Sequence, residues 1–222
     1  MRLAWLAGLL AFGTALAQTP PPMLANATMP RLGIDYEVMP IPAPTYGKGK
    51  IEVAEVFSYG CIHCAHFQPL VTAWKKTLAK DVRFEYVPAD FGGAWHVFAQ
   101  AYFAADRLKV LDKTHDAVFR AVHEQHLLAG TEPADIAAMY GNLGVDQAKF
   151  LAAMNDPALQ ARLDHARQFA LATGIEGTPT LIVAGRYRIS ATVDRGLPGM
   201  LATADYLVGL ERAAAKKAAG KH

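Results

Sequence analysis

The two cysteines of this 222-residue chain, Cys61 and Cys64, lie where a predicted strand meets a predicted helix. Residues 50–59 (KIEVAEVFSY) carry the dense apolar side chains of a buried strand. One glycine separates this strand from Cys61, and residues 63–79 then repeat apolar side chains every three or four positions, as an amphipathic helix does. Pro69 lies inside this helix and is expected to kink it. A Cys-x-x-Cys motif therefore begins a helix directly after a strand.

The spacing of the two cysteines favours redox chemistry over a structural disulfide or a metal site. A disulfide across only two intervening residues would stabilise the fold little, because the stabilisation grows with loop length. A structural zinc ion takes four ligands, often from two such pairs. His63 and His66 would complete a set of four, but the four residues fall within one or two helical turns and cannot easily surround one ion.

The predicted helix start also makes the two sulfurs unequal. Unpaired backbone N–H groups and the positive end of the helix dipole favour a thiolate at Cys61, and a protonated His63 would add to this. A stabilised thiolate stabilises the reduced form, so the disulfide becomes a strong oxidant. Cys64, one turn into the helix, is expected to be shielded and to act as the resolving thiol.

The N-terminal residues predict export. Residues 1–17 combine a positive start at Arg2, a short apolar run and the small residues Ala15 and Ala17 before a cleavage point, which indicates a signal peptide. Its removal changes the formal net charge from +2 to +1, a balance that gives no argument for nucleic-acid binding. Outside the cytosol, disulfides form and persist. Residues 18–33 are rich in proline and small residues and are expected to form an extended arm.

The remaining sequence predicts an α/β domain that is interrupted by helices. Strands are expected within residues 34–94: a short one with proline-limited ends within Tyr36–Pro44, the one before Cys61, and one at Val82–Asp90. Residues 95–174 show only helical spacing and are predicted to be an inserted all-helical domain. Within it, the HEQH sequence at 123–126 is expected on a helix surface. Residues 175–222 resume with a hairpin around Gly185 and end in a helix with a basic tail.

These features together resemble the DsbA family, periplasmic thiol:disulfide oxidoreductases with a thioredoxin fold and a helical insertion. The resemblance rests on FSYGCIHC at 57–64, Glu55 before it, Pro69, the helical insertion, and GTPT at 177–180. It implies that Cys61 is the nucleophile, that Cys64 is its buried partner, and that His63 tunes the potential.

The resemblance also implies roles for residues outside the motif. Thr178–Pro179 would form the cis-proline loop that faces the cysteines and receives substrate, and Glu55 would be a buried acid that relays a proton. Two positions depart from the family pattern. Ile62 stands where the best-known members have proline, and the basic partner often found near the buried acid is missing from residues 83–91, which offer Glu85 and Tyr86.

The resemblance further implies a monomer that oxidises reduced, newly exported proteins and is reoxidised by a membrane, quinone-linked partner of the DsbB type. We expect no cofactor and no bound metal. Two alternatives stay open. One is a disulfide isomerase or reductase of the same compartment, and the other is a copper-binding protein that uses the two cysteines and a histidine.

Overall fold

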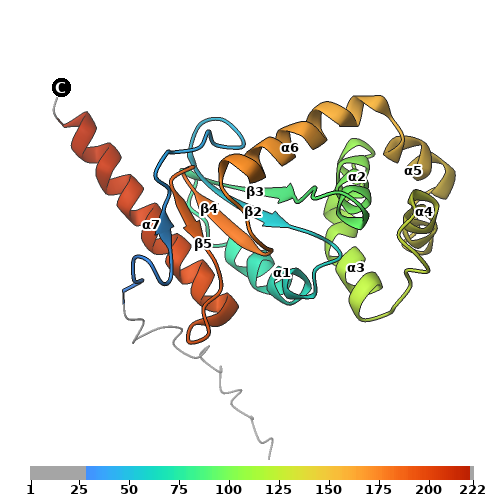
Figure 1. Ribbon diagram of the computed structural model, residues 1–222, viewed down its shortest axis with the longest axis horizontal. Coiled ribbons are helices and arrows are strands. Elements are labelled where there is room, and N and C mark those ends of the chain that lie inside the picture. Colours follow the sequence, from blue (N-terminus) through green and yellow to red (C-terminus); the bar gives the residue numbers. More distant parts are fainter. Residues whose placement is uncertain (1–28, 221–222) are drawn as a thin grey trace, which may run out of the picture.

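The computed structural model describes residues 29–220, and its centre is one five-stranded sheet (Figure 1). The strand order is β1-β5-β4-β2-β3. Only β2 and β3 are parallel to each other; the other neighbours are antiparallel. The strands are β1 (Glu37–Val38), β2 (Ile51–Phe57), β3 (Val82–Pro88), β4 (Thr180–Val183) and β5 (Tyr187–Ile189).

Both faces of the sheet are covered, because the central strands alternate apolar side chains between two hydrophobic clusters. Val53 of β2 and Val183 of β4 pack with the helices α1 (Ile62–Lys75) and α7 (Gly196–Ala219). Their neighbours Ala54 and Ile182 belong to the second cluster, which is shared with the inserted helices. The sheet is therefore the middle layer between the helix pair α1/α7 and the helical insertion.

Five α-helices fill the chain between β3 and β4, as the helical spacing predicts (Figure 1). The fold class, a thioredoxin fold with a helical insertion, is confirmed. The domain boundaries at 94/95 and 174/175 stay a prediction, and the insertion shares one continuous apolar cluster with the sheet. The helices are α2 (Ala94–Arg107), α3 (Leu111–His123), α4 (Pro133–Asn142), α5 (Gln147–Met154) and α6 (Gln160–Ala172), with the short 3₁₀ helix η1 (Pro157–Leu159) before α6.

The N-terminal part differs from the sequence prediction in two places. The short strand expected within Tyr36–Pro44 covers only Glu37–Val38, because the prolines at 40, 42 and 44 have no N–H to donate to a sheet. The end of the predicted arm is a turn: the amides of Ile34 and Asp35 donate to the Arg31 carbonyl, and the buried Asp35 carboxylate binds the Arg31 guanidinium.

Other predictions fall outside the described part or are refined by it. The predicted signal peptide and residues 18–28 of the arm lie outside the described residues. The helix α1 continues through Pro69. Within residues 29–220, no helix combines the length and the apolar character needed to cross a membrane.

Candidate active site

The cysteine pair lies at the junction of β2 and α1, where the sequence predicts it. Cys61 is the N-cap residue of α1, with an extended backbone, and Cys64 lies in the first turn. Both are free thiols. Cys61 is partly exposed, whereas Cys64 is completely buried. An incoming sulfur can therefore reach only Cys61 directly.

The loop before β4 brings Thr178 and Pro179 against Cys61, from 117 positions away in the sequence. The Thr178–Pro179 peptide bond is cis, as expected from the resemblance. Sγ of Cys61 lies 3.2 Å from the Thr178 carbonyl oxygen, to which Cys61 donates a hydrogen bond when it is protonated. Pro179 is buried and has no N–H, so it adds no donor beside the sulfurs.

The surroundings of the two sulfurs move their acidities in opposite directions. A hydrogen bond from the Cys64 thiol, with help from the amide N–H groups of His63 and Cys64, lowers the pKa of Cys61 to about 5 even though partial burial opposes this. Burial raises the pKa of Cys64 far above its ordinary value, and the hydrogen bond with Cys61 and the charge of Glu55 add to the rise. At neutral pH Cys61 is a thiolate and Cys64 a thiol.

Glu55 lies beneath the pair on β2, as the resemblance implies, and only 1% of its surface is exposed. Within the part of the chain that the structure describes, its Oε2 atom has no hydrogen-bond partner. Burial raises the pKa of Glu55 to about 8, and the positive charge of Lys75 partly offsets the rise. The side chain is therefore mostly protonated at neutral pH and is able to give or take a proton.

Lys75 is the basic neighbour of Glu55 that the sequence interpretation missed. Residues 83–91 contain no basic side chain near Glu55. Lys75 comes instead from the last turn of α1, and its Nζ lies 4.5 Å from the centre of the Tyr86 ring. Tyr86 in turn is paired with Glu55 in the sheet register. A signal for Lys75 existed, since positions 64, 68, 71 and 75 follow the spacing of one helix face.

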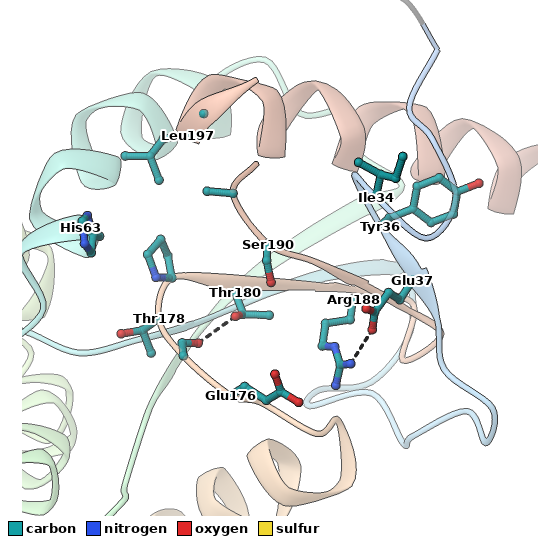
Figure 2. Close-up of a pocket in the computed structure, with 14 residues that line it drawn as sticks. Ile34, Tyr36, Glu37, His63, Glu176, Thr178, Thr180, Arg188, Ser190 and Leu197 are labelled. Atoms are coloured by element: carbon teal, nitrogen blue, oxygen red, sulfur yellow. Dashed lines mark hydrogen bonds and ion pairs between the residues drawn. The ribbon is translucent and has the colours of Figure 1, made fainter. Parts of the chain in front are cut away.

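A groove of about 440 Å³ runs from the cis-proline loop toward the edge strand β1. Figure 2 shows His63 and Leu197 at one end and Glu37 and Arg188 at the other. The Arg188 guanidinium binds the Glu37 carboxylate and the Thr173 carbonyl. Glu176 is exposed beside Thr178, and among residues 29–220 it forms no ion pair, so the groove carries one uncompensated negative charge.

The remaining histidines show one correction and no metal centre. His123 is the last residue of α3 and is partly buried, with its Nε2 bonded to a backbone carbonyl. The other three residues of HEQH follow the end of α3, so the expectation that HEQH lies on a helix surface is wrong. His63 is exposed and lines the groove. Throughout the described chain, no group of three or more His, Cys, Asp or Glu side chains is placed to hold a metal ion.

A thioredoxin-type sheet, a helix that begins at a Cys-x-x-Cys pair and a cis-proline loop against the outer sulfur define the thiol:disulfide oxidoreductases as a class. Residues 52–200 match the family model described as the DSBA-like thioredoxin domain. The thiol:disulfide interchange protein DsbA of Pseudomonas aeruginosa is 39% identical over 195 residues, which cover 88% of this chain and 92% of that protein.

Other relatives agree with this match. The DsbA of Burkholderia cepacia is 34% identical over 83% of this chain and 87% of its own length. The crystal structure of the oxidoreductase DsbA from Xylella fastidiosa superimposes with a TM-score of 0.77 at 42% identity. The match covers 84% of this chain and 100% of the Xylella chain. The structure of Pseudomonas aeruginosa DsbA gives the same TM-score at 38% identity, over 84% of this chain and 96% of that one. The chain belongs to the DSBA-like thioredoxin family.

Proposed function

We propose that this thiol:disulfide oxidoreductase donates a Cys61–Cys64 disulfide to reduced proteins that have just been exported to the periplasm. The observation that carries the proposal is the inequality of the two sulfurs. Cys61 is partly exposed and has a lowered pKa, whereas Cys64 is buried and has a raised pKa. An acidic, reachable sulfur is the better leaving group toward a substrate, because thiol–disulfide exchange speeds up as the pKa of the leaving thiol falls.

The reaction proceeds in two exchanges. A substrate thiolate attacks Sγ of Cys61, the Cys61–Cys64 bond breaks, and Cys64 leaves with the electron pair and takes a proton. Glu55, protonated at neutral pH, supplies that proton from beneath the pair. A second substrate thiolate then attacks the substrate sulfur of the mixed disulfide and expels Cys61 as a thiolate. The substrate loses two electrons and the cysteine pair gains them.

Thr178 and Pro179 would receive the substrate backbone. The Thr178 carbonyl already lies at hydrogen-bond distance from Sγ of Cys61, so an extended substrate segment attacking this sulfur would pass directly beside it. Backbone pairing is independent of side chains, which suits an enzyme with many substrates. His63, at the end of the groove next to the sulfurs, would tune the potential of the pair.

The cellular part of the proposal follows from the predicted signal peptide and from the family resemblance. The protein would act in the periplasm as a monomer, and a membrane, quinone-linked partner of the DsbB type would reoxidise the dithiol. Cell fractionation tests the location, and sedimentation tests the oligomeric state.

Oxidation of a reduced, unfolded disulfide protein tests the proposed activity. The oxidised enzyme should form disulfides in it stoichiometrically, and Cys61→Ser should abolish this. Cys64→Ala, incubated instead with a protein that carries a disulfide, should accumulate a mixed disulfide, because Cys61 attacks that disulfide and no second cysteine resolves the adduct. Faster rearrangement of a scrambled protein without net oxidation would indicate an isomerase instead, and stable one-to-one copper without oxidation would indicate a metal carrier.

Substrate docking is tested separately by Pro179→Thr, expressed beside wild type and examined on a non-reducing gel. Threonine introduces an N–H and a hydroxyl beside the sulfurs, where proline has neither. Mixed disulfides with substrates should accumulate, because the second exchange is slowed. Unchanged adducts and unchanged oxidation would remove the docking role from this loop.

A further inference from the structure

Tyr59 ties the loop that carries Cys61 to the helical insertion. The loop Ser58–Cys61 links β2 to α1, and only 1% of the Tyr59 surface is exposed. The Tyr59 ring lies among side chains of the inserted helices, with 5.1 Å between its centre and that of Phe119 and 5.3 Å to that of His115. The loop is therefore built into the insertion as well as into the sheet.

Two histidines of α3 bind the two ends of Tyr59. Nδ1 of His115 lies 2.7 Å from the Tyr59 hydroxyl in a buried position. Nε2 of His123 lies 2.7 Å from the Tyr59 backbone carbonyl, and since a carbonyl only accepts, this nitrogen carries the proton. The two histidines are eight residues apart, about 12 Å along a helix axis. One tyrosine thus spans about two turns of α3.

The helix α2 closes the remaining side of the loop. A Cβ atom on Gly60 would lie 2.8 Å from Cε2 of Phe98, so the loop is packed directly against this helix. Within the loop, the Cys61 amide donates to the Ser58 carbonyl at 3.1 Å, which closes a tight turn. A shift of Cys61 relative to the insertion would break contacts on both α2 and α3.

Packing alone does not explain the two polar contacts. A phenylalanine would fill an aromatic cluster of this kind without burying a hydroxyl and a ring nitrogen, and buried polar groups are costly unless they are paired. The Nε2 atom of His115, within the described residues, is buried without a partner, so this histidine is unfavourable for stability on that side. The contact it makes on the other side, to Tyr59, acts on the loop that ends at Cys61.

We propose that His115 and His123 are positioning residues: by holding both ends of Tyr59, they fix the sulfur of Cys61 against the first turn of α1 and the Thr178 carbonyl. The proposal rests on the role of Cys61 as nucleophile. Its physical basis is the steep distance dependence of hydrogen bonds, because amide N–H groups stabilise a thiolate only while the sulfur stays within hydrogen-bond reach. The helical insertion would thereby set the reactivity of a cysteine that belongs to the thioredoxin part.

Three variants and one control test the proposal. His123→Ala removes the donor to the Tyr59 carbonyl, His123→Gln offers an amide N–H in its place, and Tyr59→Phe removes the hydroxyl. The control, His126→Asn, changes an exposed histidine just beyond the same helix, at a left-handed backbone position that asparagine tolerates. Because His123 is partly exposed, its variants should fold, so the test does not need a variant of the buried His115.

The readouts are the Cys61 pKa, from thiolate absorbance near 240 nm in the reduced protein, its rate with a small disulfide, and the free energy of unfolding. His123→Ala and Tyr59→Phe should each raise the Cys61 pKa by about half a pH unit or more. His123→Gln should restore much of the change, and His126→Asn should leave the pKa unaltered. A loss of stability without any change in the Cys61 pKa would reduce the histidines to structural residues and overturn the proposal. If wild-type Cys61 itself titrates near 8.5–9, the nucleophile assignment fails instead, a result distinct from failure of the variants to move it.

Discussion

Replacing Glu55 by glutamine should stabilise the reduced protein, and the gain should grow with pH. The folded pKa of Glu55 is raised to about 8 from its ordinary value of 4.5, so folding favours the protonated form. Below pH 4.5 the carboxyl is protonated in both states and costs nothing. Between pH 4.5 and 8 the unfolded chain ionises and the folded one does not, so stability is lost as pH rises. Above pH 8 the loss is constant.

The magnitude follows from that raised pKa at about 1.36 kcal/mol per pH unit. The carboxyl costs about 3 kcal/mol at pH 7 and about 5 kcal/mol above pH 8. Glutamine keeps the shape and cannot ionise. For a chain of this size, 3 kcal/mol corresponds to about 6–12 °C in melting temperature.

Denaturant unfolding of both proteins from pH 4.5 to 9, under excess dithiothreitol, measures the difference. The stability gap should be small at pH 4.5 and widen toward pH 8. The same pair in a Cys61→Ser background controls for the neighbouring thiolate, whose charge also raises the Glu55 pKa. A gap that stays constant across the whole range would mean that Glu55 titrates normally, and its assignment as the proton relay would then lose its basis.

Three further results follow from the same site. The reduced protein should be more stable than the oxidised one at pH 7, because folding lowers the Cys61 pKa to about 5. The stabilisation from this shift is complete above pH 9 and fades as pH falls to 5; about 1–2 kcal/mol remains at pH 7 after allowance for the partial exposure of Cys61. Paired melting curves of the two forms at pH 5 and 7 check this. Lys75→Met should raise the Glu55 pKa above 8, because the lysine charge lowers it, and should move the pH-dependent loss of stability upward, whereas Lys76→Met should not. Because Glu176 lines the groove, the wild-type protein should oxidise cysteine peptides with basic flanking residues faster than those with acidic ones, and this preference should weaken with salt. Glu176→Lys should reverse the preference, and equal rates for both peptides in wild type would exclude it.

The parts of the site that follow one another in the sequence could be predicted from it. The strand, the glycine, the cysteine pair and the amphipathic helix are local patterns, and they place Cys61 at a helix start without knowledge of the rest of the fold. The role of Glu55 beneath the pair came from the family resemblance, because its place in the strand does not by itself say whether its side chain is buried. The position of Pro179 beside Cys61 came from the family resemblance, since no local pattern joins residues 117 positions apart.

What the sequence did not reveal depends on contacts between distant elements. Lys75 approaches Glu55 only because α1 packs across the sheet, whereas the family pattern places the basic partner at residues 83–91, on and after β3. His115 and His123 reach Tyr59 from 56 and 64 positions away, from a helix whose spacing indicates only that it is amphipathic. The short β1 was predicted from its prolines, but which two residues pair depends on where the chain lies beside β5.

The reduction potential of the Cys61–Cys64 pair, equilibrated in glutathione buffers, tests the central claim most directly. A thiolate held at Cys61 and a neutral, buried Cys64 favour the dithiol, so the disulfide should be strongly oxidising. The expected potential lies near the strong-oxidant value of about −120 mV, and a potential near the reductant value of about −270 mV would contradict the assignment of this protein as a donor of disulfides.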